Sequence, residues 1–117
     1  MPIGRLQEPS FLVLTALARG PQHGYGVLKD VEEISAGAVK LRVGTLYGAL
    51  DRLASEGLVE LDAEEVVDSR LRRYYRLTAA GAQRLEAEAT RRRSQVEVAL
   101  SRLRGVRGPL PGTGTAC

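Results

Sequence analysis

The sequence predicts an α+β fold that is mostly α-helical: a winged helix-turn-helix with a long C-terminal dimerisation helix. Three observations lead to this prediction. Before residue 57, three segments show the helical spacing of apolar residues. Between residues 58 and 78, strand-forming residues surround a run of arginines, and after residue 78 one helical pattern continues for about 27 residues. A hairpin directly after the third helix has the position of a wing.

Length and composition describe an ordinary folded domain. A chain of 117 residues suits one compact unit, and 44% hydrophobic with 26% charged residues argues against disorder over most of its length. The net charge of +3 is too small to identify a nucleic-acid-binding protein, so the placement of the charges must decide. Composition alone leaves the function open.

The cysteine count and the apolar stretches predict a soluble, cytoplasmic protein. Cys117 is the only cysteine, so neither an internal disulfide nor a cysteine-based zinc site can form. The N-terminus lacks the basic and apolar regions of a signal peptide. The longest apolar stretch, Phe11–Ala18, is far shorter than the roughly 20 residues that cross a membrane.

The first two helices are predicted from their apolar residues. The first covers Phe11–Arg19 and ends before Gly20-Pro21. Because it is apolar on almost every side, we expect it at the centre of the domain or against a second chain. The second covers Tyr25–Ile34 and has two different faces. Its core face consists of Val27, Leu28, Val31 and Ile34, and its outer face of Lys29, Asp30, Glu32 and Glu33.

The third helix, expected at about Val43–Glu56, carries the candidate contact surface. Its buried stripe follows i, i+3, i+4, i+7 spacing and consists of Leu46, Ala49, Leu50 and Leu53. Gly57 is the expected C-terminal cap.

The opposite face of this helix suits a groove of DNA. Gly44 and Gly48 leave one side thin enough for a close backbone approach, and the hydroxyl, phenol and cationic groups around them suit phosphates and base edges. The DNA contacts predicted for this region are Tyr25, Lys40, Arg42, Gly44, Thr45, Tyr47, Gly48 and Arg52. The alternative is that the glycines only relax helix packing and that Tyr47 is a half-buried surface aromatic.

Two strand-like segments, Leu58–Asp62 and Tyr75–Thr78, predict a β-hairpin with a polar turn over Glu64–Arg73. No Asn-Gly or Asp-Gly pair fixes the turn type or the register. Acids come first along this region and arginines follow: Glu60, Asp62, Glu64, Glu65 and Asp68, then Arg70, Arg72, Arg73 and Arg76. Either these form a cross-strand ladder of ion pairs, or the arginines near the tip, Arg70, Arg72 and Arg73, contact DNA phosphates or enter a minor groove.

Thr78 is the expected cap of a last helix that continues to about Arg104. At 1.5 Å per residue this helix would span about 40 Å, more than a domain of this size needs for its own core, so we expect a second chain against it. The predicted dimer interface or effector pocket consists of Leu12, Leu85, Ala89, Val96, Leu100 and Leu103. Arg91–Arg93 suits a solvated face better than DNA contact. Arg92 falls on the apolar stripe and needs a partner such as Glu88 or Glu97.

These elements divide the chain into three predicted parts. Residues 1–77 form the winged helix-turn-helix DNA-binding domain, and residues 78–104 form the dimerisation helix. Residues 105–117 are rich in glycine and proline, which favours a disordered tail.

Four motifs follow one another along the chain: His23-Gly24-Tyr25-Gly26, Gly44-Thr45-Leu46-Tyr47, Glu56-Gly57-Leu58-Val59 and Arg72-Arg73-Tyr74-Tyr75-Arg76-Leu77-Thr78. In this order they resemble the PadR family of bacterial transcriptional regulators, over residues 8 to 90. The single helix after the wing is similar to the smaller of the family's two architectural groups.

The resemblance implies a homodimer in which the N- and C-terminal helices of two chains intertwine. Two recognition helices would then enter successive major grooves of double-stranded operator DNA, about 34 Å apart. Family members are mostly repressors, and several release DNA when they bind a small hydrophobic or aromatic effector. The turn Asp68-Ser69-Arg70-Leu71 departs from the glycine and proline common in the family, and the chain has no tryptophan. An effector pocket would therefore be aliphatic, lined by Leu12, Val96 and Leu100, or absent.

Two other functions remain as alternatives to a DNA-binding repressor. A winged-helix module for protein contact would agree with the charge balance from Lys40 to Arg76, where seven cations meet seven acids. An enzyme would need a catalytic set, yet His23 is the only histidine and suits a turn or cap before the second helix. We expect no catalytic residues, no metal site and no cofactor.

Overall fold

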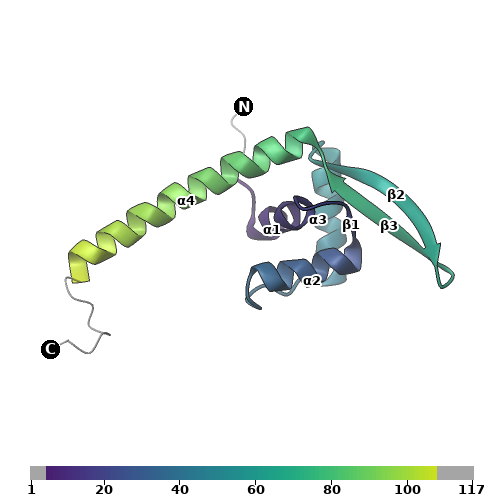
Figure 1. The fold of residues 1–117 in the computed structure, drawn as a ribbon, viewed down its shortest axis with the longest axis horizontal. Helices are drawn as coiled ribbons and strands as arrows, with labels where there is room; N and C mark the ends of the chain where they lie inside the picture. Colours follow the sequence, from purple (N-terminus) through teal and green to yellow (C-terminus); the bar gives the residue numbers. More distant parts are fainter. Residues whose placement is uncertain (1–4, 108–117) are drawn as a thin grey trace. The chain divides into compact units, whose positions relative to one another are not determined.

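The computed structural model describes residues 5–107 and contains two compact units, one ending at Glu86 and the other beginning at Ala87. The elements occur in the order shown in Figure 1: α1 (Glu8–Leu17), β1 (Gln22–His23), α2 (Gly24–Ile34), α3 (Val43–Ser55), β2 (Val59–Val67), β3 (Arg70–Leu77) and α4 (Ala79–Arg107). The described residues thus combine four helices with one small antiparallel sheet, which confirms the predicted winged helix-turn-helix with a long last helix.

Helix α1 forms the centre of the first unit. Leu12, Val13, Leu14 and Leu17 are buried in one cluster with side chains of α2 and α3. The chain therefore buries α1 by itself, which agrees with the first of the two predicted positions. The helix begins at Glu8, three residues earlier than predicted. Proline in its first turn has no N–H to lose there, so it starts a helix readily.

Helix α2 departs from its predicted faces at two residues. Val27 and Val31 are fully buried as expected, but Ile34, the last residue of the helix, is 41% exposed. Asp30 was predicted to face solvent and is only 7% exposed. Its carboxylate lies 3.6 Å from Nε of Arg19 and accepts a hydrogen bond from Gln22. These polar partners allow a carboxylate to be buried.

Helix α3 agrees with the prediction in extent, buried stripe and end. Leu46, Ala49, Leu50 and Leu53 are all buried. Gly57 has a φ of +78°, and the N–H groups of Gly57 and Leu58 bond to the carbonyls of Ala54 and Leu53 at 3.0 and 2.9 Å. These two hydrogen bonds define a Schellman cap, for which glycine is the favoured residue.

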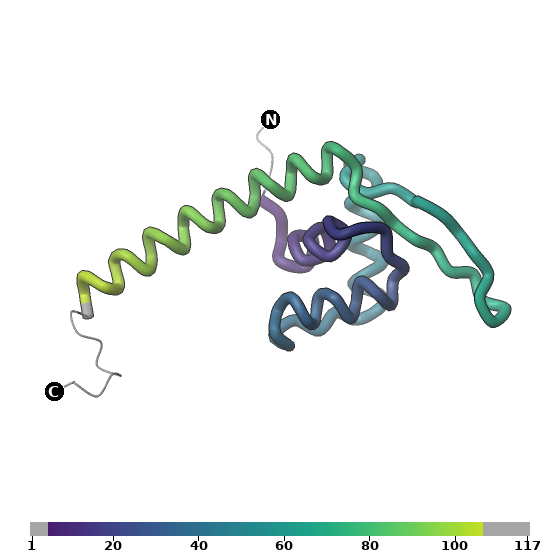
Figure 2. The backbone as a smooth tube through the Cα atoms, viewed as in Figure 1, coloured from purple at the N-terminus to yellow at the C-terminus, as the bar shows by residue number. Residues whose placement is uncertain are grey.

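The sheet corrects the predicted hairpin. Its strand order is β1-β3-β2, and both strands of the hairpin are longer than expected. The segment predicted as a polar turn belongs mostly to the strands, and the actual turn is Asp68-Ser69, with a φ of 53° and 64°. Positive φ at both central residues is the geometry of a type I′ turn. Figure 2 shows the two strands running side by side from the helices to this turn.

Strand β1 was not predicted. It contains only Gln22 and His23, which pair with Tyr75 and Tyr74 of β3. Two residues are too few to show an alternating pattern, so the strand exists through its tertiary pairing alone. Its consequence is that the residue before α2 is fixed against the hairpin.

Helix α4 begins as predicted, because the Thr78 hydroxyl accepts the N–H of Gly81 at 2.9 Å. It ends at Arg107, three residues beyond the predicted end. Residues 108–117, most of the predicted tail and with it Cys117, lie outside the described residues. Over residues 5–107 no helix is long and apolar enough to span a membrane.

Candidate nucleic-acid interface

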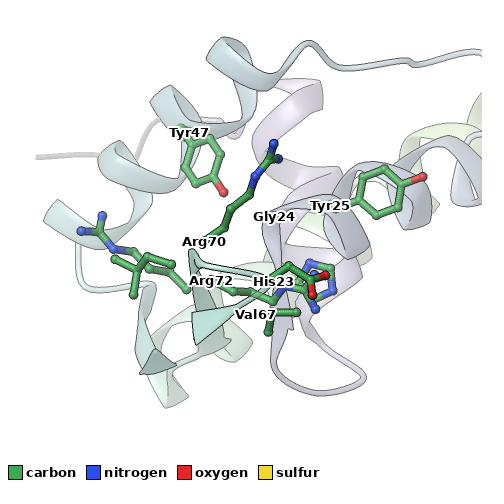
Figure 3. A pocket seen from close by; sticks show the side chains of 10 residues that line it. His23, Gly24, Tyr25, Tyr47, Val67, Arg70 and Arg72 are labelled. Atoms are coloured by element: carbon green, nitrogen blue, oxygen red, sulfur yellow. The ribbon is translucent and has the colours of Figure 1, made fainter. Parts of the chain in front are cut away.

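A groove of about 630 Å³ lies between the start of α2, the exposed face of α3 and the tip of the hairpin. Its lining consists of His23, Gly24, Tyr25, Tyr47, Val67, Asp68, Arg70, Leu71, Arg72 and Arg73. Five of these residues, Tyr25, Tyr47, Arg70, Arg72 and Arg73, are predicted DNA contacts from three separate stretches of sequence. The fold brings them to one place (Figure 3).

Tyr47 is held in the groove by a glycine of α2. A Cβ atom at the buried Gly24 would overlap the phenol oxygen of Tyr47, so a larger residue here would force the Tyr47 ring to move. The Tyr47 side chain nevertheless remains 37% exposed, and it faces the groove beside Arg70 in Figure 3. The motifs around residues 23 and 44 therefore meet physically, one supporting the aromatic ring of the other.

The glycines of α3 have no such neighbour. Gly44 and Gly48 are exposed, and a Cβ atom built on either would find nothing within 4 Å among the described residues. Glycine inside a helix costs roughly 1 kcal/mol relative to alanine. Packing within the described residues does not explain this cost. Thr45 lies between the two glycines in sequence and is exposed as well.

The predicted cationic contacts outside the groove fall into two places. Lys40 and Arg42 are exposed directly before α3, with Lys40 3.9 Å from a carboxylate oxygen of Glu32. Arg52 lies elsewhere, because its guanidinium donates to the Ser10 hydroxyl at 3.2 Å and lines a separate hollow with Arg5 and other residues. The structure therefore does not unite Arg52 with the other predicted contacts.

The hairpin contains both of the charge arrangements left open by the sequence. Near its base, Arg76 pairs with Glu60 and Asp62, and Arg73 pairs with Glu64 at 3.1 Å. The bond to Glu60 raises the pKa of Arg76 further above its ordinary value. At the tip, the side chains of Arg70 and Arg72 have no ion pair or hydrogen bond in the part of the chain that the structure describes. The ladder therefore occupies the base, and the cations without partners are at the tip.

His23 is a groove residue that the sequence assigned only to a turn or cap. The cap role is correct, since Nδ1 accepts the N–H of Gly26 at 3.4 Å. Its ring also packs edge-on against Tyr74, with centroids 5.4 Å apart. Burial and the nearby Arg72 lower the pKa of His23, while Glu65 opposes them. The position of His23 in the first motif, beside Tyr25, was the available signal.

The predicted dimer or effector residues occupy different surroundings. Leu12 is buried in the core of the first unit, and Leu85 packs against that core. Val96, Leu100 and Leu103 of the second unit are between 41% and 54% exposed, and Ala89 is exposed too. Arg92 is paired as predicted, because its Nε lies 2.8 Å from a carboxylate oxygen of Glu88.

Comparison with protein families identifies the chain. Residues 13–87, more than half of the sequence, match the model of the transcriptional regulator PadR-like family. The chain belongs to this family. The matched region includes every element that lines the groove, namely the start of α2, α3 and the hairpin.

Curated relatives agree with this assignment. The PadR-like chain is 36% identical over 84 residues to a transcriptional regulator of Mycobacterium tuberculosis, covering 72% of this chain and 74% of the relative. It is 31% identical over 97 residues to a transcriptional regulator of Escherichia coli, covering 83% of this chain and 43% of the relative. A transposon protein of Streptomyces fradiae is 40% identical over 85 residues, 73% of this chain. The chain spans only 23% of that protein's length.

Solved structures show the same fold. A PadR family regulator from Clostridium difficile superposes with a TM-score of 0.70 at 25% identity, covering 83% of this chain and 99% of that one. Bacillus subtilis PadR in complex with operator DNA superposes with a TM-score of 0.62 at 21% identity, covering 69% of this chain and 47% of that one. At 21% identity, the likeness to Bacillus subtilis PadR shows a shared fold and nothing further.

Proposed function

We propose that this PadR-like regulator binds operator DNA through α3 and the hairpin, and that it acts as a repressor. One observation carries the proposal: the fold gathers two arginines without carboxylate partners, Arg70 and Arg72, in one groove with Tyr47 of α3, a helix whose exposed face also carries Gly44 and Gly48. Cations at this position suit phosphates, and a helix with a thin face suits the major groove.

Helix α3 provides the contacts to the major groove in this proposal. Gly44 and Gly48 let the helix backbone approach the DNA, and Thr45 offers a hydroxyl between them. Tyr47, supported by Gly24, directs its phenol at a phosphate. Arg42 and Lys40, exposed just before the helix, add cations where the backbone of the DNA would pass.

The hairpin contacts the neighbouring backbone. Arg70 and Arg72 can bind phosphate without first losing an internal partner, whereas Arg73 would have to leave Glu64. Arg52 remains in the proposal only as a distant phosphate contact, because it lies in a different hollow.

A homodimer completes the proposal. Val96, Leu100 and Leu103 are apolar and largely exposed on a helix of 29 residues, and a second copy of the chain would cover them. Leu12 adds little to such a surface, because its own core already buries it. Two copies would place two α3 helices on one operator.

A small hydrophobic or aromatic effector would act at the dimer surface. It would meet aliphatic side chains there, since the sequence has no tryptophan and little aromatic character. A protein of this function acts where the operator is, in the cytoplasm, and the proposed mechanism has no catalytic step, metal or cofactor.

A protein-contact module is the second candidate, and the ion pairs of the hairpin change the charge count that supports it. The charge balance that favoured it includes Glu60, Asp62 and Glu64, which are already paired with Arg73 and Arg76. Without these pairs, five cations and four acids remain in the segment, and at the tip Arg70 and Arg72 are matched in number by Glu65 and Asp68. The charge count therefore stays close to neutral, and the argument for DNA depends on where the two arginines lie and not on the sum.

Selection from a random-sequence duplex library, followed by a salt titration on the selected duplex, tests the proposal. We expect one enriched sequence with two-fold symmetry, bound at least about a thousandfold more tightly than an unrelated duplex. The logarithm of affinity should fall steeply with the logarithm of salt concentration, by about 0.9 per phosphate contact. No enrichment, together with a flat salt response, would favour the protein-contact module.

A further inference from the structure

The two ring nitrogens of His23 have different surroundings. Nδ1 accepts the backbone N–H of Gly26 at 3.4 Å and so caps α2. A nitrogen that accepts a hydrogen bond carries no proton, so the neutral ring must carry its proton on Nε2. The cap at Nδ1 therefore makes Nε2 a hydrogen-bond donor.

The ring is also fixed in position. His23 pairs with Tyr74 across β1 and β3, and the two rings pack edge to face at 5.4 Å. Nε2 has no hydrogen-bond partner among the described residues, although His23 lines the groove. An oriented donor in a groove, without an internal acceptor, is available to a ligand.

The groove is suited to an anion. Arg70 and Arg72 line it without carboxylate partners among residues 5–107, and Asp68 at the turn is the one carboxylate in the lining. Burial and Arg72 lower the pKa of His23, while Glu65 raises it less. The ring is thus kept neutral near pH 7, which preserves both the cap at Nδ1 and the proton at Nε2.

We propose that His23 donates its Nε2 proton to a phosphate of the DNA backbone that Arg70 and Arg72 also bind. This phosphate would join the start of α2 to the wing, and its ligand class is a phosphodiester oxygen. The inference rests on the proposed function, because it adds a third donor to one phosphate of the proposed DNA surface. It assigns His23 two simultaneous roles, one for each nitrogen.

Two substitutions separate these roles. In His23→Asn the short side chain still caps α2, since asparagine is among the best N-cap residues, but it has no donor at the position of Nε2. In His23→Gln the amide nitrogen reaches the position of Nε2, but glutamine is a poor cap. Fluorescence anisotropy with a labelled mixed-sequence DNA duplex measures binding, and thermal unfolding measures folding, for the full chain and both variants.

The expected pattern crosses over between the two variants. His23→Asn keeps the cap but, like His23→Gln, loses the ring against Tyr74, so it should melt above His23→Gln and not above the wild type. While folded, it should bind the duplex about tenfold more weakly, with an unchanged salt slope, because a neutral donor releases no counterion. His23→Gln should melt a few degrees lower and, below that temperature, bind within about threefold of the wild type.

Two outcomes would overturn these assignments. Wild-type affinity in His23→Asn would overturn the contact and leave a cap alone, while the proposed function would stand. A wild-type protein whose binding to the duplex is weak and independent of salt would overturn the proposed function, and the contact with it.

Discussion

The base and the tip of the β2–β3 hairpin carry the same residue type in different surroundings. At the base, Arg73 and Arg76 meet carboxylates of β2. At the tip, Arg70 lies opposite Val67 and has no carboxylate partner among the described residues. Arg72 lies opposite Glu65, whose carboxylate instead accepts the Tyr74 hydroxyl at 2.6 Å. Register explains why Arg70 has no ion pair, because it lies opposite Val67, whereas Arg72 lies opposite a carboxylate that the Tyr74 hydroxyl already occupies.

The glycines of the site show the same contrast. A side chain at Gly24 would displace the phenol of Tyr47, whereas a Cβ atom at Gly44 or Gly48 would meet nothing within 4 Å among the described residues. One glycine is explained by a neighbour within the chain, and the proposed DNA contact would explain the other two. In both comparisons, the proposed DNA surface consists of groups that have no partner in the described part of the chain: the arginines at the tip and the glycines of α3.

Removing the cations at the tip should have the largest effect. We expect Arg70→Ala with Arg72→Ala to weaken operator binding about a hundredfold, because two charge-assisted phosphate contacts are lost. Anisotropy on the selected duplex measures this. The matched control replaces a whole pair at the base, Glu64→Gln with Arg73→Gln, and should stay within about threefold of the wild type. Equal losses in the two double variants would remove the distinction between tip and base.

Adding a side chain to the exposed face of α3 should change the stability of the protein and its affinity for the operator in opposite directions. Gly48→Ala should raise the free energy of unfolding by about 1 kcal/mol, since alanine is the better helix former, and weaken operator binding about tenfold by holding the backbone away. Gly24→Ala should instead weaken operator binding without this gain in stability, because its methyl group displaces the Tyr47 ring. Denaturant unfolding and anisotropy test both, and full affinity in Gly48→Ala would exclude close approach at this residue.

Removing the carboxylate partner of one arginine at the base should make that arginine available to DNA, like the arginines at the tip. Glu64→Gln leaves Arg73 without its partner, so binding to an unrelated duplex should tighten about threefold and its salt slope should increase by about 0.9. Stability should change by less than about 0.5 kcal/mol, because the Arg73–Glu64 pair is exposed to water. If binding and slope both stay the same, Arg73 does not face the DNA.

The smallest expected effect is a pH dependence at His23. Its pKa is lower in the folded chain than the ordinary 6.5, because of burial and Arg72, with Glu65 opposing. The folded state therefore favours the neutral ring, and the associated stability is complete above pH 6.5 and lost as the pH falls through the folded pKa. Between about pH 7.5 and about pH 5.5, the wild type should lose a degree or two more of melting temperature than His23→Asn. An identical loss in both proteins would contradict a lowered pKa.

The sequence predicted those parts of the fold that depend on local patterns. The buried stripe of α3, the cap at Gly57 and the cap at Thr78 each depend on residues within one or two helical turns, and all three are confirmed. The family match confirms the resemblance carried by the four motifs. Spacing and capping chemistry are readable because they act over short distances along the chain.

The parts that were missed depend on contacts between distant segments. The prediction made the hairpin strands too short, because most of their side chains are polar or exposed and show no clear alternation. Asp30 is buried because Arg19 and Gln22 come within reach only in the folded chain. His23 became a candidate only when β1 placed it against Tyr74. None of these contacts has a local signature.

The salt dependence of operator binding, compared between the tip and the base of the hairpin, tests the proposed DNA surface most directly. It is measured on one selected duplex for the wild type, for Arg70→Ala with Arg72→Ala, and for Glu64→Gln with Arg73→Gln. The slope of log affinity against log salt concentration should become shallower by about 1.8 in the tip variant and stay unchanged in the base variant. An unchanged slope in the tip variant would contradict the assignment of Arg70 and Arg72 to phosphate contacts.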